Sequence, residues 1–341
     1  MSSPPVELIV LIIGIALVFD FTNGFHDSAN SISTVVSTRV LSPKKAVVFA
    51  AFFNFVAAFG FGVAVASTIS KTINLAMVPT DTIPFIVLAA LIGAIGWNLI
   101  TWYLGFPSSS SHALIGGLAG AGISAGGVAA VKLSTVTVVA QFMVISPVIG
   151  LIVGFFFMAL VLRLTRSHTR DKMDHHFRRL QLVSAAAYSF SHGTNDAQKT
   201  MGIITPLLFS IGYYGAGADP GHLPVPVWVI LAAHVAIALG TLSGGWRIVK
   251  TLGYKITRLR PVHGFAAETV SAGTIIGMSV AGIPVSTTHI ISTAIMGVGS
   301  TKGPGAVRWG IARNIIGAWI MTIPASAAIG FAAFWLLSPF I

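Results

Sequence analysis

The chain has 341 residues, of which 55% are apolar and only 9% are charged, whereas soluble domains carry about 25% charged residues. It contains no cysteine, which excludes disulfides, thiol catalysis and cysteine-ligated metal sites. The net charge of +11 could indicate a nucleic-acid partner. However, the basic residues lie in short segments between apolar runs, where they set the orientation of membrane proteins. The composition predicts a polytopic membrane protein with no nucleic-acid partner.

Ten apolar runs follow one another along the chain, each near the roughly 20 residues that a helical span requires. The first run lacks the basic segment of a signal peptide, so we expect it to remain as a span. The runs cover residues 6–38, 46–70, 83–104, 107–131 and 135–162, and then residues 180–211, 227–246, 265–282, 284–301 and 306–338. The hydrophilic stretch between the two groups is rich in arginine.

This division predicts an all-α protein in three parts: a first half at 1–162, a basic linker at 163–179 and a second half at 180–341. Five crossings in each half would start the second half on the opposite face, so related halves would be inverted-topology repeats. If the chain starts outside, nearly all its basic clusters fall on the cytoplasmic side. We therefore expect both termini outside, a cytoplasmic linker, and a place in the plasma (inner) membrane.

Two pairs of motifs relate the halves. FTNGFHDSAN at 21–30 matches FSHGTNDAQK at 190–199, and GFPSSSSH at 105–112 matches GIPVSTTH at 282–289. Two matches in the same order indicate a duplicated unit. Polar residues, glycine and proline inside apolar runs predict a break in the first and the fourth run of each half.

The hydroxyl triplets of the second motif pair indicate an anion site. Unwound backbone at membrane depth requires surrounding protein or water, and the helix N-termini that it frees attract anions. N-capping is the simpler interpretation, but a cap needs one hydroxyl and not three. The doubled triplets favour a tetrahedral oxyanion, with His112 and His289 either orienting the hydroxyls or capping the helices. The triplets are Ser109, Ser110 and Ser111, and Ser286, Thr287 and Thr288.

Acidic residues inside the apolar runs form a second group of candidates. Asp27 and Asp196 are matched in the two halves, whereas Asp20 and Glu268 have no copy. A charge buried in a membrane costs about 3 kcal/mol or more, so it indicates function unless it pairs with a neighbouring helix. Asp27 and Asp196 would repel an anion unless Lys199, H⁺ or Na⁺ offset them. A cation and an anion would then promote each other's binding.

Polar neighbours of these acids could take part. Asn30, Asn195 and Gln198 offer neutral amides, and His26 adjoins Asp27, where an imidazole can carry a proton near neutral pH. The predicted coupling group is His26, Asp27, Asp196 and Glu268. We predict no resident metal, because the close spacing at 174–176 suits a metal poorly. The glycine-rich stretch 116–127 lacks a nucleotide-binding motif, so active transport would draw on an ion gradient.

At these motifs the chain resembles the inorganic phosphate transporter (PiT) family, especially its bacterial low-affinity branch. The residues that carry the resemblance are GFHDSAN at 24–30, SHGTNDAQK at 191–199, FPSSSSH at 106–112, IPVSTTH at 283–289 and WNLITWYLGFPSSSSHALIG at 97–116. The likeness covers nearly the whole chain. It implies inverted repeats with broken or re-entrant helices, a homodimer, and phosphate bound between the halves, free or as a metal complex.

The resemblance also implies that Asp27, Asn30, Asn195, Asp196 and the two hydroxyl triplets belong to the site. The chain reads Gly-Phe-His-Asp where many relatives read Gly-Ala-Asn-Asp, so His26 replaces an asparagine. This departure weakens the case for a sodium site and resembles proton-coupled bacterial members.

The sequence therefore predicts a secondary active transporter that imports inorganic phosphate with H⁺ and needs no cofactor. The alternatives are coupling to Na⁺, sulfate as cargo, an anion channel, and a membrane hydrolase. Mirrored interruptions favour alternating access over a channel. Two equivalent Ser-His motifs argue against an enzyme, because hydrolysis needs one nucleophile with an oriented base. The predicted phosphate ligands are Asp27, Asn30, Ser109, Ser110, Ser111, Asn195, Asp196, Gln198, Lys199, Ser286, Thr287 and Thr288.

Overall fold

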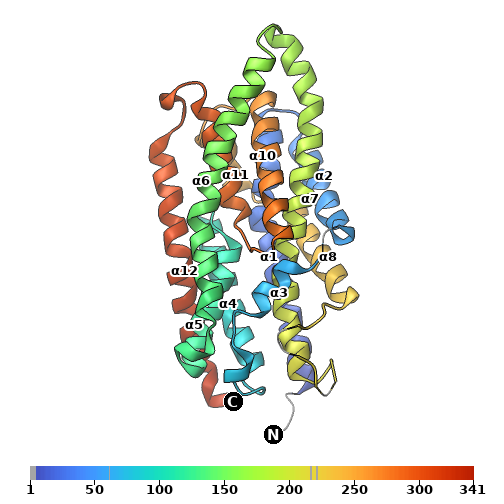
Figure 1. Ribbon diagram of the computed structural model, residues 1–341, viewed down its shortest axis with the longest axis vertical. Coiled ribbons are helices and arrows are strands. Elements are labelled where there is room, and N and C mark those ends of the chain that lie inside the picture. The colour runs from blue at the N-terminus through green and yellow to red at the C-terminus, as the bar shows by residue number, and fades with distance from the viewer. Residues whose placement is uncertain (1–4, 61, 216, 220–221) are drawn as a thin grey trace.

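Twelve α-helices make up the described part of the chain, residues 5–60, 62–215, 217–219 and 222–341, in a computed structural model (Figure 1). The helices are α1 (Val6–Ser37), α2 (Pro43–Val56), α3 (Ala64–Ser70), α4 (Ile83–Leu104), α5 (Ser110–Gly126), α6 (Leu133–Leu164), α7 (Arg170–Ser210), α8 (Val227–Ser243), α9 (Trp246–Lys250), α10 (Pro261–Val280), α11 (Thr287–Ser300) and α12 (Trp309–Leu337). A π-helical turn, Thr251–Lys255, extends α9. Short 3-10 turns lie at Ala57–Phe59, Leu75–Met77, Val128–Ala130, Pro304–Ala306 and Ser338–Phe340.

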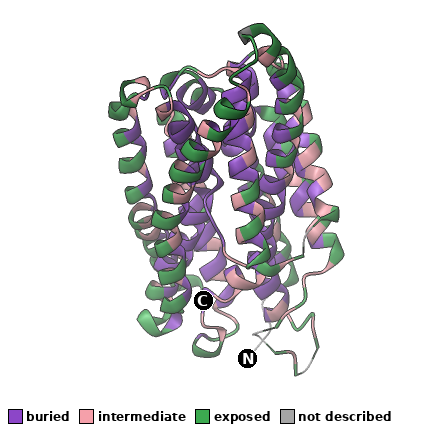
Figure 2. Cartoon of the chain, turned by 45° about the horizontal axis from the view of Figure 1, so that its top comes forward, coloured by how far each residue is buried: buried purple, intermediate pink, exposed green. Residues whose placement is uncertain are grey.

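Long apolar helices identify a membrane protein. Helices α1, α4, α6 and α12 are each long and apolar enough to cross a bilayer, and the bent pairs α2–α3 and α8–α9 raise the number of candidate spans to as many as six. The bends measure 85° and 60°. Large apolar side chains such as Val144, Phe156, Ile320 and Trp335 lie exposed on α6 and α12. Figure 2 shows buried residues lining the interior and exposed ones on the outer faces of the helices. Such apolar outer faces suit lipid.

The runs at 107–131 and 284–301 form the second arms of helical hairpins. Helix α5 has 17 residues and α11 has 14, so they measure about 26 and 21 Å, which is shorter than a hydrocarbon core of about 30 Å. Helix α5 turns back along α4, and α11 turns back along α10. The two hairpins occupy the lower and upper parts of Figure 1. These two runs therefore do not supply the full crossings that five spans per half would need.

Each hairpin also packs against the last helix of the other half, α5 on α12 and α11 on α6. The hairpin tips meet inside the bundle: the Ser111 hydroxyl donates to the Val285 carbonyl oxygen at 3.0 Å. The rings of His112 and His289 lie 4.8 Å apart between centroids. The N-termini of α5 and α11 consequently face a common interior region.

The predicted breaks at 21–30 and 190–199 are wrong, because α1 and α7 run through both motifs without interruption. Neither motif contains proline, and their glycines permit close helix packing instead. A Cβ atom on Gly193 would lie 2.6 Å from the Asn54 carbonyl oxygen of α2, and one on Gly24 would overlap the backbone of Ile237 in α8. The bends lie instead within α2–α3 and α8–α9, the second apolar run of each half.

Two hydrophobic clusters sandwich a polar layer. The first cluster contains the start of α1 and the end of α7, together with α4 and α5. The second contains the end of α1 and the start of α7, together with α10 and α11. Residues 20–28 of α1 and 189–196 of α7 belong to neither cluster. Both motifs of the first pair therefore lie at the middle of the bundle.

Basic segments gather at one end of the molecule. The termini lie at the lower end of Figure 1, and the connection 165–169 between α6 and α7 lies at the upper end. Near that upper end, Arg178 donates to the Arg39 carbonyl oxygen, and Arg260 pairs with Asp174 at 2.9 Å. Helix α7 starts at residue 170, so most of the predicted linker 163–179 is helical.

Candidate functional site

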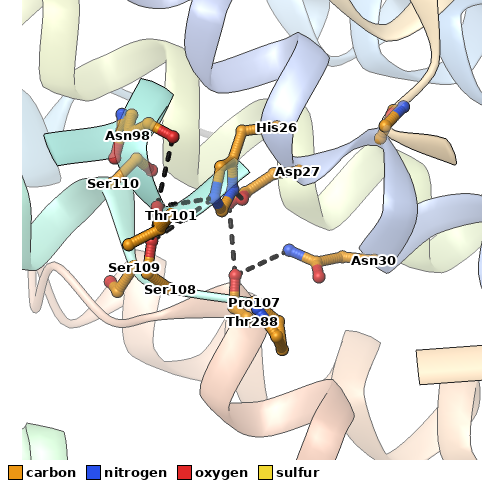
Figure 3. Close-up of polar contacts among 12 residues, drawn as sticks. His26, Asp27, Asn30, Asn98, Thr101, Pro107, Ser108, Ser109, Ser110 and Thr288 are labelled. Carbon is orange, nitrogen blue, oxygen red and sulfur yellow. Dashed lines mark hydrogen bonds and ion pairs between the residues drawn. The ribbon is translucent and has the colours of Figure 1, made fainter. Parts of the chain in front are cut away.

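A buried polar centre lies where α1 and α7 pass the N-termini of α5 and α11 (Figure 3). Asp27, Asp196 and Lys199 are each at most 1% exposed. Charged groups persist in such surroundings only when they are paired or hydrogen-bonded. The partners of each group therefore indicate what the centre can bind.

The first half contributes an acid–imidazole pair. Nδ1 of His26 lies 2.7 Å from Oδ1 of Asp27. Nε2 of the same ring lies 3.2 Å from the Thr101 hydroxyl and 3.3 Å from the Ser108 hydroxyl. Figure 3 shows His26 between Asp27 and these hydroxyls. Hydrogen bonds on both nitrogens fix the ring orientation and hold one nitrogen against a carboxylate oxygen of Asp27.

Hydroxyls of α11 approach the other oxygen of Asp27. The Thr287 and Thr288 hydroxyls donate to Oδ2 of Asp27 at 3.5 and 3.4 Å. The Asn30 amide donates to the Thr288 hydroxyl at 2.8 Å. Asp27 thus faces the positive end of α11, where a carboxylate is stabilised.

The second half contributes an ion pair. Nζ of Lys199 lies 2.8 Å from Oδ2 of Asp196 and 3.2 Å from the Ser110 hydroxyl of α5. The Asn195 amide donates to Oδ1 of Asp196 at 2.9 Å and to the Val285 carbonyl oxygen at 3.1 Å. The amide therefore bonds to one oxygen of Asp196, and the lysine forms an ion pair with the other.

His192 joins the two acids, and the sequence-based site did not include it. Its Nε2 lies 3.4 Å from Oδ2 of Asp196 and 4.0 Å from Oδ2 of Asp27. Atoms of these three side chains all lie within 4.8 Å of one another, close enough to share a proton or a small cation. The sequence could have indicated His192, because it lies one helical turn before Asp196 and therefore on the same face of α7.

The hydroxyls within each triplet make different contacts. Ser109 and Ser286 are N-caps, because their hydroxyls accept from the backbone N–H of His112 at 3.3 Å and of His289 at 3.1 Å. N-capping therefore explains the first hydroxyl of each triplet and not the others. Ser110, Thr287 and Thr288 reach the charged groups, and Ser111 links the two tips.

The two histidines at the hairpin tips pack against aromatic rings. Besides facing His112, the His289 ring stacks on Trp319 with 3.8 Å between centroids. The Trp319 indole N–H donates to the Pro107 carbonyl oxygen at 2.9 Å. Neither predicted role of His112 and His289 describes these contacts, which hold the tips of the hairpins together.

Two predicted residues lie apart from the centre. The Gln198 carboxamide oxygen accepts from the backbone N–H groups of Val65 at 2.8 Å and Ala66 at 3.2 Å, so it caps α3. Glu268 of α10 accepts from Ser184 and from Gln181. These bonds satisfy Glu268 without any residue of the centre.

The centre combines features that favour opposite charges. Two helix N-termini and Lys199 attract an anion, whereas Asp27, His192 and Asp196 can hold a cation. A buried site of this kind between two helical hairpins of a membrane bundle is typical of membrane transporters.

Comparisons with known proteins agree with this class. Residues 23–330 match the phosphate transporter family. The chain is 52% identical over 322 residues to the probable low-affinity inorganic phosphate transporter of Rhizobium meliloti (strain 1021), covering 94% of each protein. It is 44% identical over 334 residues to the protein of the same description in Bacillus subtilis (strain 168), covering 97% of each. The chain belongs to the phosphate transporter family, and it is a multi-pass membrane protein and not an enzyme.

A solved structure shares the fold. The structure described as "The sodium-dependent phosphate transporter" superposes with a TM-score of 0.86 at 25% identity, covering 98% of this chain and all of that one. The helical hairpins and bent helices therefore belong to a known transporter fold.

Proposed function

We propose that this protein imports inorganic phosphate across the plasma membrane by secondary active transport coupled to protons. The observation that carries the proposal is the meeting of two hydroxyl-bearing helix N-termini and Lys199 beside Asp27 and Asp196. Phosphate offers several acceptor oxygens for such donors. The relatives from Rhizobium meliloti and Bacillus subtilis are described as inorganic phosphate transporters.

The proposed phosphate ligands fall into two groups. Asn30, Ser110, Asn195, Lys199, Thr287 and Thr288 supply side-chain donors at the centre. Ser109, Ser111 and Ser286 order the two helix N-termini that face it. Asp27 and Asp196 would accept from the O–H groups of a protonated phosphate. Gln198 stays a predicted ligand, although its carboxamide oxygen accepts from the backbone N–H of Val65 in α3.

The proposed coupling begins at Asp27. A proton shared by His26 and Asp27 removes negative charge beside the phosphate, so each ion strengthens the binding of the other. Asp196 already has Lys199 as a partner and would contribute through His192. We propose that Glu268 acts at a later step, because Ser184 and Gln181 hold it outside the centre.

We also propose that the halves 1–162 and 180–341, joined by 163–179, are inverted repeats that alternate access to the centre. Supporting this, Pro147 in α6 and Pro324 in α12 are as far apart in sequence as Pro107 and Pro284. Each hairpin packs against the last helix of the other half, α5 against α12 and α11 against α6. Placing the basic end in the cytoplasm leaves both termini outside.

Sodium coupling is the second candidate. It is favoured by the likeness to a structure described as sodium-dependent, whereas His26 in the first motif favours protons. From the family resemblance we further propose a homodimer, and phosphate either free or as a metal complex as the cargo. Sulfate is the alternative anion.

Reconstituted protein can test these proposals. Labelled phosphate uptake into proteoliposomes should follow an inward proton gradient in sodium-free buffer, and excess sulfate should not compete. Uptake that needs sodium at constant pH would establish the second candidate. Competition by sulfate would show that the site also accepts sulfate. Absence of uptake under either gradient would contradict the proposal as a whole.

A further inference from the structure

A second acid of α1 lies outside the phosphate centre. Asp20 precedes Asp27 by seven residues, so it is on the same helix face and about 10 Å closer to the end of the molecule that carries the termini. Its side chain is fully buried, and neither carboxylate oxygen has a hydrogen-bond partner. An ionised carboxyl group is very costly in such a place unless something binds it.

The side chains next to Asp20 leave further polar atoms unsatisfied. Asn23 of α1 and Thr200 of α7 adjoin its carboxylate. The Asn23 amide and the Thr200 hydroxyl are buried, and both approach the Asp20 carboxylate without forming a well-directed hydrogen bond. Native proteins leave few buried polar atoms unpaired, so several together at one point are unusual and indicate a binding site.

Helix α4 adds another unsatisfied amide at this level. Thr101 of α4 meets His26 of α1, and Asn98 lies one turn earlier on α4, level with Asn23. Both amide atoms of Asn98 are buried without a partner. Unsatisfied carboxylate and amide atoms therefore lie on α1 and α4, and an unsatisfied hydroxyl lies on α7.

Nearby charges do not neutralise Asp20. The ionisable groups within electrostatic reach of it, among the described residues, are Asp196 and Lys199, both on α7. These two pair with each other at 2.8 Å, so Lys199 is already engaged. The ligand that Asp20 lacks must therefore bring its own positive charge.

The second half has no equivalent acid. The position in α7 that matches Asp20 is Ser189, which is also buried with an unpaired hydroxyl. The phosphate centre has an acid in each half, whereas this cluster of buried polar side chains has an acid only on α1, which begins at the end of the molecule that carries the termini. A ligand bound there would distinguish the two sides of the membrane.

We propose that Asp20, together with Asn23 and Thr200, binds a monovalent coupling cation, H⁺ or Na⁺, in a site separate from the phosphate centre. A carboxylate, an amide oxygen and a hydroxyl form an all-oxygen ligand set that suits a small hard cation. A proton would bind to one Asp20 oxygen and be donated to the Asn23 amide oxygen. The inference rests on the proposed phosphate transport and adds to it a site for the driving ion.

The test separates coupling from phosphate movement. Proteoliposomes containing Asp20→Asn protein are assayed for accumulation of labelled phosphate under each ion gradient, and for exchange of phosphate at equal concentrations on both sides. Asparagine mimics the occupied, neutral site, so exchange should stay within about threefold of wild type while accumulation falls by about tenfold or more. Asp20→Glu should restore accumulation.

Two comparisons keep the test specific. Ser189→Ala alters the matched buried position and should leave both assays unchanged, whereas Asp27→Asn should lose both. The gradient that drives the wild-type protein identifies the ion. If that ion is sodium, adding it without phosphate should raise the melting temperature of wild type more than that of Asp20→Asn. If it is a proton, the number of protons carried per phosphate should fall in Asp20→Asn.

Wild-type accumulation in Asp20→Asn would overturn the inference. Loss of exchange together with accumulation, in a variant that remains monodisperse and as heat-stable as wild type, would also overturn it, because Asp20 would then serve phosphate binding. Absence of exchange in the wild-type protein would instead contradict the proposed function itself.

Discussion

The two matched acids occupy equivalent places and are neutralised by different groups. Asp27 of α1 pairs with His26 at 2.7 Å, and Asp196 of α7 pairs with Lys199 at 2.8 Å. A buried lysine beside a carboxylate forms a standing ion pair, whereas an imidazole can gain or lose its proton near neutral pH. The first acid is therefore paired with an imidazole and the second with a lysine, and His192 also lies 3.4 Å from Asp196.

This difference assigns separate tasks to the halves. The Asp196–Lys199 pair in the second half would keep a constant charge and bind phosphate. The His26–Asp27 pair in the first half would bind the driving cation. The helices alone would not reveal this division, because α1 and α7 present their acids at the same depth between the two hydrophobic clusters.

The largest expected effect comes from breaking the standing pair. Asp196→Asn leaves Lys199 buried without its counter-charge, which should lower the free energy of unfolding by about 3–5 kcal/mol. The thermal unfolding of detergent-solubilised protein measures this loss. Asp196→Asn combined with Lys199→Met should recover most of the stability without recovering uptake. A single variant as stable as wild type would show that the pair is not a structural unit.

Removing the adjustable acid should affect transport more than folding. Asp27→Asn keeps the shape of the side chain and leaves no unpaired cation, so uptake should fall by about 100-fold, equivalent to about 2.7 kcal/mol, in protein of near-normal melting temperature. Labelled phosphate uptake provides the measurement. Asp174→Asn, at a half-buried acid paired with Arg260, is the matched control and should transport normally.

Exchanging the imidazole should alter the response to pH. His26→Asn retains a hydrogen-bonding side chain beside Asp27 but cannot carry a proton, so uptake should depend less on external pH than in wild type. The pH profile of initial uptake rates, recorded in sodium-free buffer, is the readout. A variant whose profile keeps the wild-type shape would remove His26 from coupling.

The smallest effects should distinguish donors from caps within one triplet. Ser110→Ala removes a hydroxyl that contacts Lys199, and a lost hydrogen bond to a charged group corresponds to about a tenfold weaker phosphate affinity. Ser109→Ala removes an N-cap, so it should lower thermal stability by about 1 kcal/mol while changing affinity less. Equal effects on affinity would mean that the triplet does not divide its tasks in this way.

Sequence reasoning located the buried polar side chains of the centre better than it predicted the backbone around them. Matched positions and residue types were enough to single out Asp27, Asp196 and the hydroxyl triplets, because a charge inside an apolar run is costly and rarely persists without a functional role. Lys199 could be identified for the same reason. The ligand roles themselves remain proposals that the variants above would test.

The errors share a physical cause. Glycine within an apolar helix permits either a break or a close helix contact, and at Gly24 and Gly193 the contact prevailed. Hydropathy reports how apolar a run is and not how deep it reaches, so it left open whether 107–131 and 284–301 are hairpins or single broken spans.

Phosphate affinity measured at two cation concentrations tests the central claim most directly, namely that a cation at Asp27 makes a buried phosphate tolerable. Purified wild type and Asp27→Asn are compared by calorimetric titration at the same pH and sodium concentration. The protonation state of free phosphate is then the same in both experiments and does not affect the comparison. Wild type should bind phosphate more tightly as the coupling cation increases, and Asp27→Asn should bind it weakly and independently of that cation. The same cation dependence in both proteins would contradict the account.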